Sequence, residues 1–240
     1  MNYLAHFVYN HDIRSLPCEP YFVMGVALPD LWSRYSRSRR IRWRVVNSAV
    51  VAAPPEVQLR DGLLNHLAAD QQFHGAVTFR RWQGELKQAV PAGDVHPALV
   101  DFLTHVSIEL VLDAHLMHAD DDLVETFYNV VARCDPIVVE QAIATVADVA
   151  TDGLRDVIQQ FVARRFLHNY RTPAGLADVV RIILTLASIP LPPEKYVDDV
   201  LRAARERVTP EQVWAELAGR DPARMQRRNN WREHKDTAVQ

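Results

Sequence analysis

Residues 66–74 read His66-Leu-Ala-Ala-Asp70-Gln-Gln-Phe-His74, and residues 105–113 read His105-Val-Ser-Ile-Glu109-Leu-Val-Leu-Asp113. Each stretch places three side chains that can bind metals at positions i, i+4 and i+8 among apolar residues. Because four residues advance a helix about 40° beyond a full turn, each trio forms one polar stripe along a mostly apolar helix. A buried imidazole or carboxylate without a partner costs several kcal/mol of folding free energy. We therefore expect the two stripes to face each other across a charged group, for which a metal ion is the simplest candidate.

The rest of the chain has the apolar periodicity of helices. Apolar residues recur at three- and four-residue spacing, alternating runs typical of strands are scarce, and only eight of the 240 residues are glycine. This pattern predicts an all-α protein, a compact multi-helix bundle with a metal site between core helices. The expected helices span residues 2–11, 20–33, 56–74, 75–89, 96–118, 120–132, 136–149, 152–167, 173–187, 193–207 and 210–218.

The prolines at positions 190, 192 and 193 form the clearest linker in the chain. They divide it into a main helical domain over residues 1–190, which carries both stripes, and a C-terminal helical extension over 191–218. Residues 219–240 are mostly charged, with few apolar anchors, so we expect a basic, flexible tail or a segment that docks on a partner.

Composition excludes several classes of protein. The net charge of −3 gives no overall field that would attract nucleic acid. Cys18 and Cys134 form neither a disulfide framework nor a zinc-knuckle spacing, which favours a reducing compartment. The N-terminus lacks a basic region followed by an apolar stretch, and no run approaches the roughly 20 apolar residues of a membrane span. We therefore expect a cytoplasmic protein. The absence of a Gly-rich phosphate loop and of a Gly-x-Ser-x-Gly motif disfavours nucleophilic catalysis by a side chain.

The first two members of each stripe are the best candidate ligands. His66 and Asp70 lie one turn apart, so one ion about 2 Å from each can bridge them, and His105 and Glu109 repeat this spacing. Mixed oxygen and nitrogen donors suit manganese, iron or zinc. With one histidine near the N-terminus and the aspartate of Gly25-Val-Ala-Leu-Pro-Asp30, the predicted ligands are His6, Asp30, His66, Asp70, His105 and Glu109.

The third members, His74 and Asp113, lie about 12 Å along the helix axis from the first members, so one ion cannot touch both ends of a trio. Either two ions are present or the third residue orients a ligand or contacts substrate. We predict that His74 or Asp113 is the catalytic proton carrier. The alternative is structural: His66 and His105 are core histidines, each paired with the carboxylate one turn away.

These motifs resemble the acyl carrier protein phosphodiesterases (holo-ACP hydrolases), a family distantly related to the HD-type metal phosphohydrolases. The resemblance covers residues 1–190 thinly, through Met1-Asn-Tyr-Leu-Ala-His6, residues 25–30, 62–70, the acidic helix near residue 109, and 166–176. It implies metal-site roles for His6, Asp30, His66 and Asp70, and it places Glu109 and Asp113 where the family has two aspartates. The chain departs from the family at Leu67, where the family tends to have arginine, and at His74, where it has aspartate. The missing arginine removes one phosphate ligand of the family from this chain.

The order Gly-x-x-x-Pro-Asp, His-x-x-x-Asp-x-x-x-His and His-x-x-x-Glu is also similar to the zinc-dependent phospholipase C and single-strand nuclease superfamily. Those enzymes use a processed N-terminal residue as a metal ligand after secretion. This sequence shows no signal peptide, so we place that relation second.

An arginine-rich segment follows Asp30. We predict that Arg37, Arg39 and Arg40 bind the substrate phosphate or an acidic partner, and acyl carrier protein, which is acidic and carries a phosphodiester-linked arm, suits both. Aromatic residues interleave with these arginines and would permit stacking on a nucleobase, although nucleic acid is not the favoured partner. The simpler alternative is that they pack beneath the loop. The aromatic residues are Trp32, Tyr35 and Trp43.

Together these observations predict a metal-dependent phosphodiesterase in which a metal-activated water attacks a phosphodiester, with the phosphopantetheine arm of acyl carrier protein as the candidate substrate. One alternative is a zinc-dependent phospholipase C-like hydrolase. Another is a non-catalytic helical module that keeps the stripes as buried structural pairs and docks an acidic partner. Metal content separates the enzymes from the module.

Overall fold

The computed structural model describes residues 1–9, 19–36 and 41–218. Within these ranges the chain forms α-helices and one 3₁₀ helix and no strand, so the predicted all-α class is confirmed. Over the same ranges, no helix combines the length and apolar character that crossing a bilayer requires. The predicted tail, 219–240, lies outside them.

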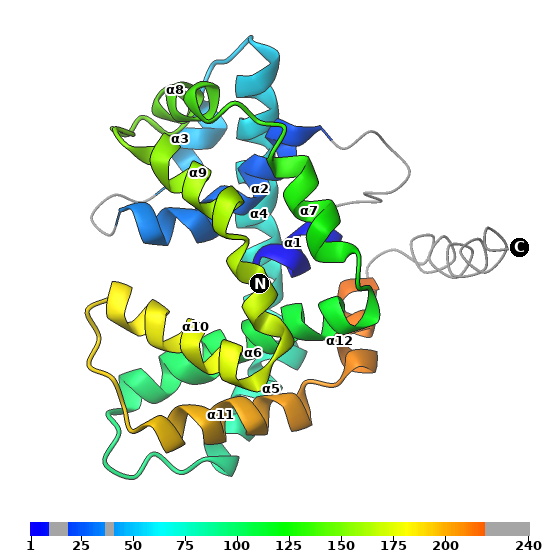
Figure 1. The fold of residues 1–240 in the computed structure, drawn as a ribbon, viewed down its shortest axis with the longest axis vertical. Coiled ribbons are helices and arrows are strands. Elements are labelled where there is room, and N and C mark those ends of the chain that lie inside the picture. The colour runs from blue at the N-terminus through cyan, green and yellow to red at the C-terminus, as the bar shows by residue number, and fades with distance from the viewer. Residues whose placement is uncertain (10–18, 37–40, 219–240) are drawn as a thin grey trace, which may run out of the picture.

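The helices form two parts, one above the other in Figure 1, with α4 running along the long axis of the molecule. The upper part contains α2 (Pro20–Tyr35), α3 (Trp43–Ser48), α4 (Pro54–His74), α7 (Leu123–Val131), α8 (Pro136–Ala147) and α9 (Leu154–Arg164). The lower part contains α5 (Val77–Ala89), α6 (Pro97–Ala119), α10 (Pro173–Leu186) and α11 (Glu194–Arg207). Between or beside the two parts lie α1 (Tyr3–Tyr9), the 3₁₀ helix η1 (Phe166–Arg171) and α12 (Pro210–Ala218).

Local sequence accounts for many of the helix starts. Proline occupies the first position of α2, α4, α6, α8 and α10, where its missing N–H removes no helical hydrogen bond. Asp135 caps α8 by accepting the Ile137 N–H at 2.9 Å, and Thr172 caps α10 by accepting the Gly175 N–H at 3.0 Å. These caps fix where the helices begin.

Apart from shifts of two or three residues at several helix ends, the described helices differ from the sequence prediction at two places. The expected helix over 152–167 ends at Arg164, because Arg165 adopts a left-handed conformation with φ of 45° and the chain continues as η1. Helix α3 was not predicted, since six residues are too few for an apolar period to show.

Helices α2 and α4 cross in close contact at two glycines. A Cβ added at Gly62 would lie 2.2 Å from the Phe22 carbonyl oxygen and 2.9 Å from the Gly25 Cα. A Cβ added at Gly25 would lie 2.5 Å from the Leu59 carbonyl oxygen. Only glycine fits at both positions, and the resulting backbone contact brings the middle of α2 against the polar stripe of α4.

The segment after the proline linker packs on the main core. Helix α11 contacts α5, α6 and α10, and it buries Val197, Val200 and Leu201. Helix α12 is held to α5 by a hydrogen bond from Trp82 Nε1 to Gln212 Oε1 at 3.0 Å. Residues 194–218 thus extend the lower part of the bundle and leave the stripes of α4 and α6 at the junction between the two parts.

Candidate metal centre

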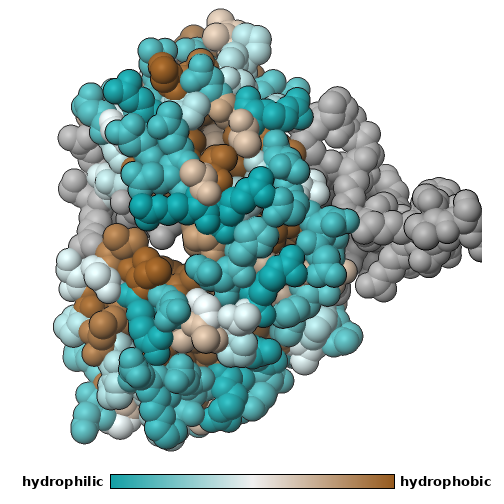
Figure 2. Space-filling model, viewed as in Figure 1, coloured by the Kyte–Doolittle hydropathy of each residue, from teal (hydrophilic) through white to brown (hydrophobic). Residues whose placement is uncertain are grey.

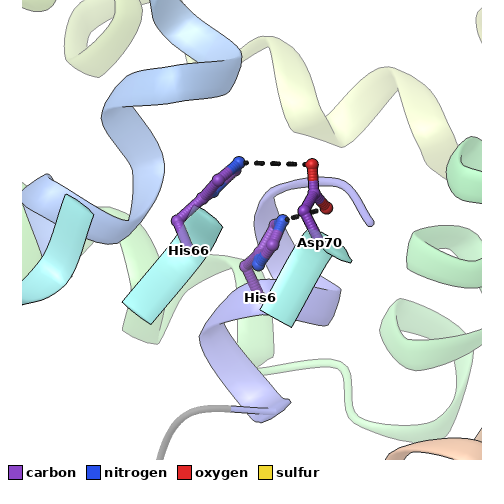
Figure 3. A group of neighbouring side chains, drawn as sticks. All are labelled: His6, His66 and Asp70. Carbon is purple, nitrogen blue, oxygen red and sulfur yellow. Dashed lines mark hydrogen bonds and ion pairs between the residues drawn. The ribbon is translucent and has the colours of Figure 1, made fainter. Parts of the chain in front are cut away.

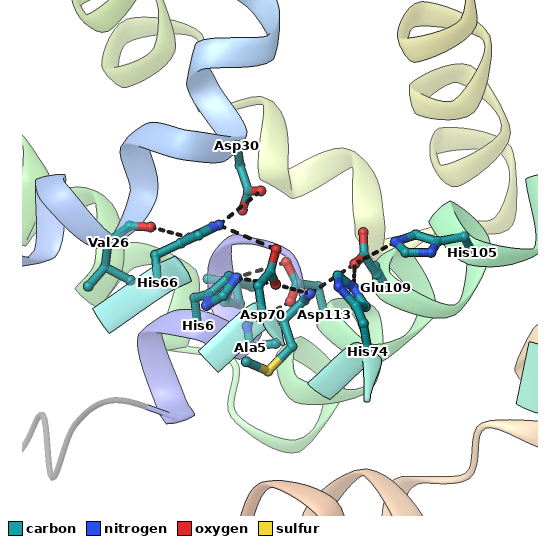
Figure 4. Close-up of polar contacts among 12 residues, drawn as sticks. Ala5, His6, Val26, Asp30, His66, Asp70, His74, His105, Glu109 and Asp113 are labelled. Carbon is teal, nitrogen blue, oxygen red and sulfur yellow. Dashed lines mark hydrogen bonds and ion pairs between the residues drawn. The ribbon is translucent and has the colours of Figure 1, made fainter. Parts of the chain in front are cut away.

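The two polar stripes meet at the junction, as the sequence predicts, and form two groups of side chains. In the first group, His6 of α1 joins His66 and Asp70 of α4 (Figure 3). In the second, His74 of α4 joins His105 and Glu109 of α6 (Figure 4). Within each group the potential ligand atoms lie within 4.8 Å of one another, close enough to share one ion. His74, predicted as a proton carrier, thus lies among the candidate ligands.

The orientation of His66 is set by the glycine crossing. Its Nδ1–H donates to the Val26 carbonyl oxygen at 2.8 Å, and since a carbonyl only accepts, Nε2 of the neutral ring carries the lone pair. That Nε2 faces Asp70 Oδ2 at 3.6 Å and Asp30 Oδ1 at 4.0 Å, both too long for a hydrogen bond. Two ligands of one ion lie about 3 to 3.5 Å apart, so the His66–Asp70 spacing fits a cation placed between them.

His6 stacks on His66 with ring centroids 3.8 Å apart and points its Nε2 at the same carboxylate, 3.1 Å from Asp70 Oδ1. Its Nδ1 is buried without a hydrogen-bond partner among the described residues. Burial and the neighbouring His66 lower the pKa of His6 to about 3, so this ring is neutral. Burial alone would lower the pKa of His66, but Asp30 and Asp70 raise it above its usual value. A neutral imidazole paired with a carboxylate is a ligand arrangement for a divalent metal.

Glu109 is the centre of the second group. Its Oε1 lies 2.8 Å from His74 Nε2 and 3.2 Å from His105 Nε2, and the two imidazole rings are 4.5 Å apart. Burial alone would raise the pKa of Glu109, but the Met1 amino group and the two histidines hold it well below its usual range. Phe79 packs against both rings at 5.0 Å, which limits their movement.

The amino group of Met1 lies between the two groups, a position that the side-chain pattern did not reveal. It donates to Asp70 Oδ1 at 2.7 Å and to Glu109 Oε1 at 2.8 Å, and it is fully buried. Burial alone would lower its pKa, but Glu109, Asp70 and Asp30 raise the pKa to about 10. The ammonium is thus the positive charge toward which the carboxylates of both groups turn. A backbone amine leaves no mark in a side-chain pattern, so the only available signal was that Met1 lies five residues before the predicted ligand His6.

The two remaining aspartates differ in role. Asp113 is fully buried and accepts the N–H groups of Leu4 at 3.0 Å and Ala5 at 2.7 Å, so it ties α1 to α6. Burial raises its pKa to about 8, against the effect of the two amides. This geometry favours an anchoring role over the predicted role as proton carrier. Asp30 lies beside the first group, with its Oδ1 4.0 Å from His66 Nε2, and burial raises the pKa of Asp30 to about 7.

The predicted phosphate-binding residues Arg37, Arg39 and Arg40 lie outside the described residues. Of the three aromatic residues nearby, Trp32 and Tyr35 pack against described parts of the fold and Trp43 does not. Trp32 is buried, its ring contacts that of Tyr35 at 4.9 Å, and the Tyr35 hydroxyl donates to the Asp152 carbonyl at 3.1 Å. Trp43, at the start of α3, is exposed.

A cavity of about 600 Å³ is lined by Glu109 of the second group and by Asp30, which faces His66 of the first group. A small molecule that enters this cavity can therefore reach these two carboxyl groups. Comparison with protein-family models, curated proteins and solved structures finds no match to this chain.

Proposed function

We propose that this protein is a metal-dependent phosphodiester hydrolase that binds divalent cations at its two histidine–carboxylate groups. The observation that carries the proposal is the position of His66. Val26 fixes its Nδ1–H, so Nε2 faces the Asp70 carboxylate across 3.6 Å and carries a lone pair when the ring is neutral. Two electron-rich atoms face each other favourably only with a cation between them, either a proton or a metal ion.

Each group supplies a complete set of protein ligands for one ion. The first ion would be held by His6, His66 and Asp70, with Asp30 facing the same point, and the second by His74, His105 and Glu109. Three protein ligands with an open position are typical of catalytic sites, and these donors suit manganese, iron or zinc. The Met1 amine becomes a further nitrogen donor when it loses its proton.

The chain's own residues would orient and enclose the reaction. Val26 fixes the ring of His66, and Asp113 anchors the helix that carries His6. Apolar side chains of α6 and α10 line the cavity beside Asp30 and Glu109 and would reduce the water around a bound substrate. When bound, two divalent cations acidify a water molecule and neutralise charge on the phosphoryl oxygens.

The phosphodiester arm of acyl carrier protein is the substrate that the resemblance suggests, and a phospholipase C-like substrate is the second candidate. The non-catalytic module remains the alternative of a different class. The contacts of Glu109 with His74 at 2.8 Å and with His105 at 3.2 Å support this alternative, because they pair the second group without a metal ion.

Elemental analysis and a hydrolysis assay test the proposal. The purified protein should hold up to two equivalents of metal and hydrolyse bis(4-nitrophenyl) phosphate, and a chelator should abolish the activity. His66→Gln and His105→Gln should each lose metal and at least 100-fold in kcat/KM. His168→Gln is the matched control, since His168 of η1 pairs with Glu125 at 2.9 Å and belongs to neither group. A metal-free wild-type protein that stays inactive with added manganese, iron or zinc would establish the structural alternative.

A further inference from the structure

The cavity beside the metal groups has a polar end and a long apolar wall. Asp30 and Glu109, its acidic lining residues, come from the metal-group region, and Asn2 donates to the Tyr170 hydroxyl at 3.1 Å nearby. Beyond them the wall is built by α6, η1 and α10. Its apolar side chains include Phe102, Val106, Leu110, Phe166, Ile183 and Leu186.

The surface supports the same division. Figure 2 shows apolar side chains gathered at the hollow between the upper and lower parts, with hydrophilic surface around them. Ile182 of α10 lines the cavity and is 43% exposed, so the apolar wall reaches the outside. An exposed apolar wall that continues into a polar, metal-binding end is unusual for a surface with no ligand.

No lysine or arginine among the described residues lines the cavity. The wall built by α6, η1 and α10 is apolar among the described residues, and such a surface is not complementary to a polyphosphate or an acidic peptide. The wall also offers few polar atoms that could read the edges of a nucleobase. Its branched aliphatic side chains instead suit a flexible aliphatic chain.

We propose that the substrate is a phosphodiester that carries one linear aliphatic chain, and that this chain lies along the wall while the phosphodiester lies at the Asp30–Glu109 end. The inference rests on the proposed function and adds its substrate class. A methylene group takes somewhat less than the roughly 30 Å³ of a water molecule, so about 600 Å³ holds on the order of 20 such groups. This is enough for the phosphodiester and a chain of roughly 8 to 16 carbons.

Chain length is the variable that tests this proposal. Alkyl 4-nitrophenyl phosphodiesters with ethyl, butyl, octyl and dodecyl chains would be assayed below their micelle concentrations. Burying one methylene group is worth about a fourfold change in binding, so kcat/KM should rise by up to about fourfold per added carbon until the wall is covered. Equal kcat/KM for all four esters would overturn the proposal.

Two variants with similar exposure locate the effect. Ile182→Asp places a charge at the mouth of the cavity and should lower kcat/KM for the dodecyl ester at least tenfold while leaving the ethyl ester within twofold. Ile137→Asp changes an isoleucine of α8 that is 48% exposed and lies outside the cavity lining, so it should change neither. If Ile182→Asp leaves the dependence on alkyl chain length intact, the alkyl chain of the substrate lies elsewhere and the proposal fails.

Calorimetric binding of ethyl phosphate and dodecyl phosphate separates this proposal from the proposed function. Tighter binding of the dodecyl compound, with a more negative heat-capacity change, supports the aliphatic site even when no ester is hydrolysed, and then only the proposed function fails. Hydrolysis without any dependence on chain length leaves the function standing and overturns the aliphatic site. A concentration-dependent dimer that Ile182→Asp dissociates would assign the wall to a second copy of this chain and also overturn the proposal.

Discussion

Replacing Gly62 by alanine should disturb the fold and the candidate metal centre together. The new Cβ would lie 2.2 Å from the Phe22 carbonyl oxygen and 2.9 Å from the Val26 amide nitrogen. Carbon–oxygen contacts in proteins are rarely shorter than about 3.3 Å, so α2 and α4 must separate locally by about 1 Å. All three nearest atoms belong to the backbone, and none of them can rotate away.

The cost in stability can be estimated from these contacts. Overpacking of a core costs about 1–3 kcal/mol, and a clash with backbone belongs at the upper end of that range. The better helix propensity of alanine offsets about 1 kcal/mol. The net loss is about 2 kcal/mol, which lowers Tm by about 4–8 °C in a protein of this size.

The same separation should weaken metal binding. The His66 Nδ1–H donates to Val26 O at 2.8 Å, and about 1 Å of additional separation breaks that hydrogen bond. Loss of such a partner lowers metal affinity by about 10- to 100-fold. Differential scanning calorimetry of the metal-free protein and titration with zinc or manganese measure the two effects separately.

Gly84→Ala is the matched control, because a Cβ at Gly84 of α5 would meet nothing within 4 Å. It should leave metal affinity unchanged and raise stability by up to about 1 kcal/mol. A Gly62→Ala protein with the Tm and the metal affinity of wild type would refute the idea that the glycine crossing positions His66.

Three further outcomes are expected. Burial raises the pKa of Asp113 to about 8 in the folded protein, above the unfolded value near 3.9, so its contribution to stability is present below about pH 4 and is lost as pH rises toward 8. Asp113→Asn should flatten that decline in stability, and parallel denaturation profiles of the two proteins from pH 4 to 8 would contradict this. An extension of two residues before Met1 should displace its amine from Asp70 and Glu109 and lower the free energy of unfolding by about 3–5 kcal/mol. Chemical denaturation measures this loss, and an unchanged denaturation midpoint would argue against a buried ammonium. Burial raises the pKa of the Cys134 thiol to about 12. In a Cys18→Ser protein, which keeps only this thiol, a chromogenic disulfide should therefore react at pH 8 only after unfolding in guanidinium, and rapid reaction of the native protein would contradict the burial of Cys134.

The sequence predicted the fold class and the convergence of the two stripes for the same reason. Polar residues four positions apart in apolar helices share one face of the helix. Two such faces in one core contact each other because a buried polar side chain without a partner is costly. That argument brought His66 and Asp70 near His105 and Glu109, and the structure places them at one junction.

What the sequence did not predict depends on tertiary contacts. The Met1 amine has no side-chain signature, and the role of Asp113 follows from the docking of α1 on a helix about a hundred residues later. His74 belongs with His105 because α4 and α6 present facing turns, a register that periodicity alone does not fix. The left-handed Arg165 that ends α9 also lacks a local signal, since that conformation is usual for glycine.

The bond between Asp113 and the first turn of α1 has a consequence for synthesis of the protein. The partners are separated by 109 and 108 residues, so α1 leaves the ribosome long before the residue that anchors it exists. At about 5–20 residues per second, that interval lasts roughly 5 to 20 seconds. Throughout it, the buried face of α1, with Leu4 and Phe7, has no α6 to pack against and is exposed to chaperones and to other nascent chains. The candidate centre is therefore completed only after α6 has been synthesised and α1 has docked on it.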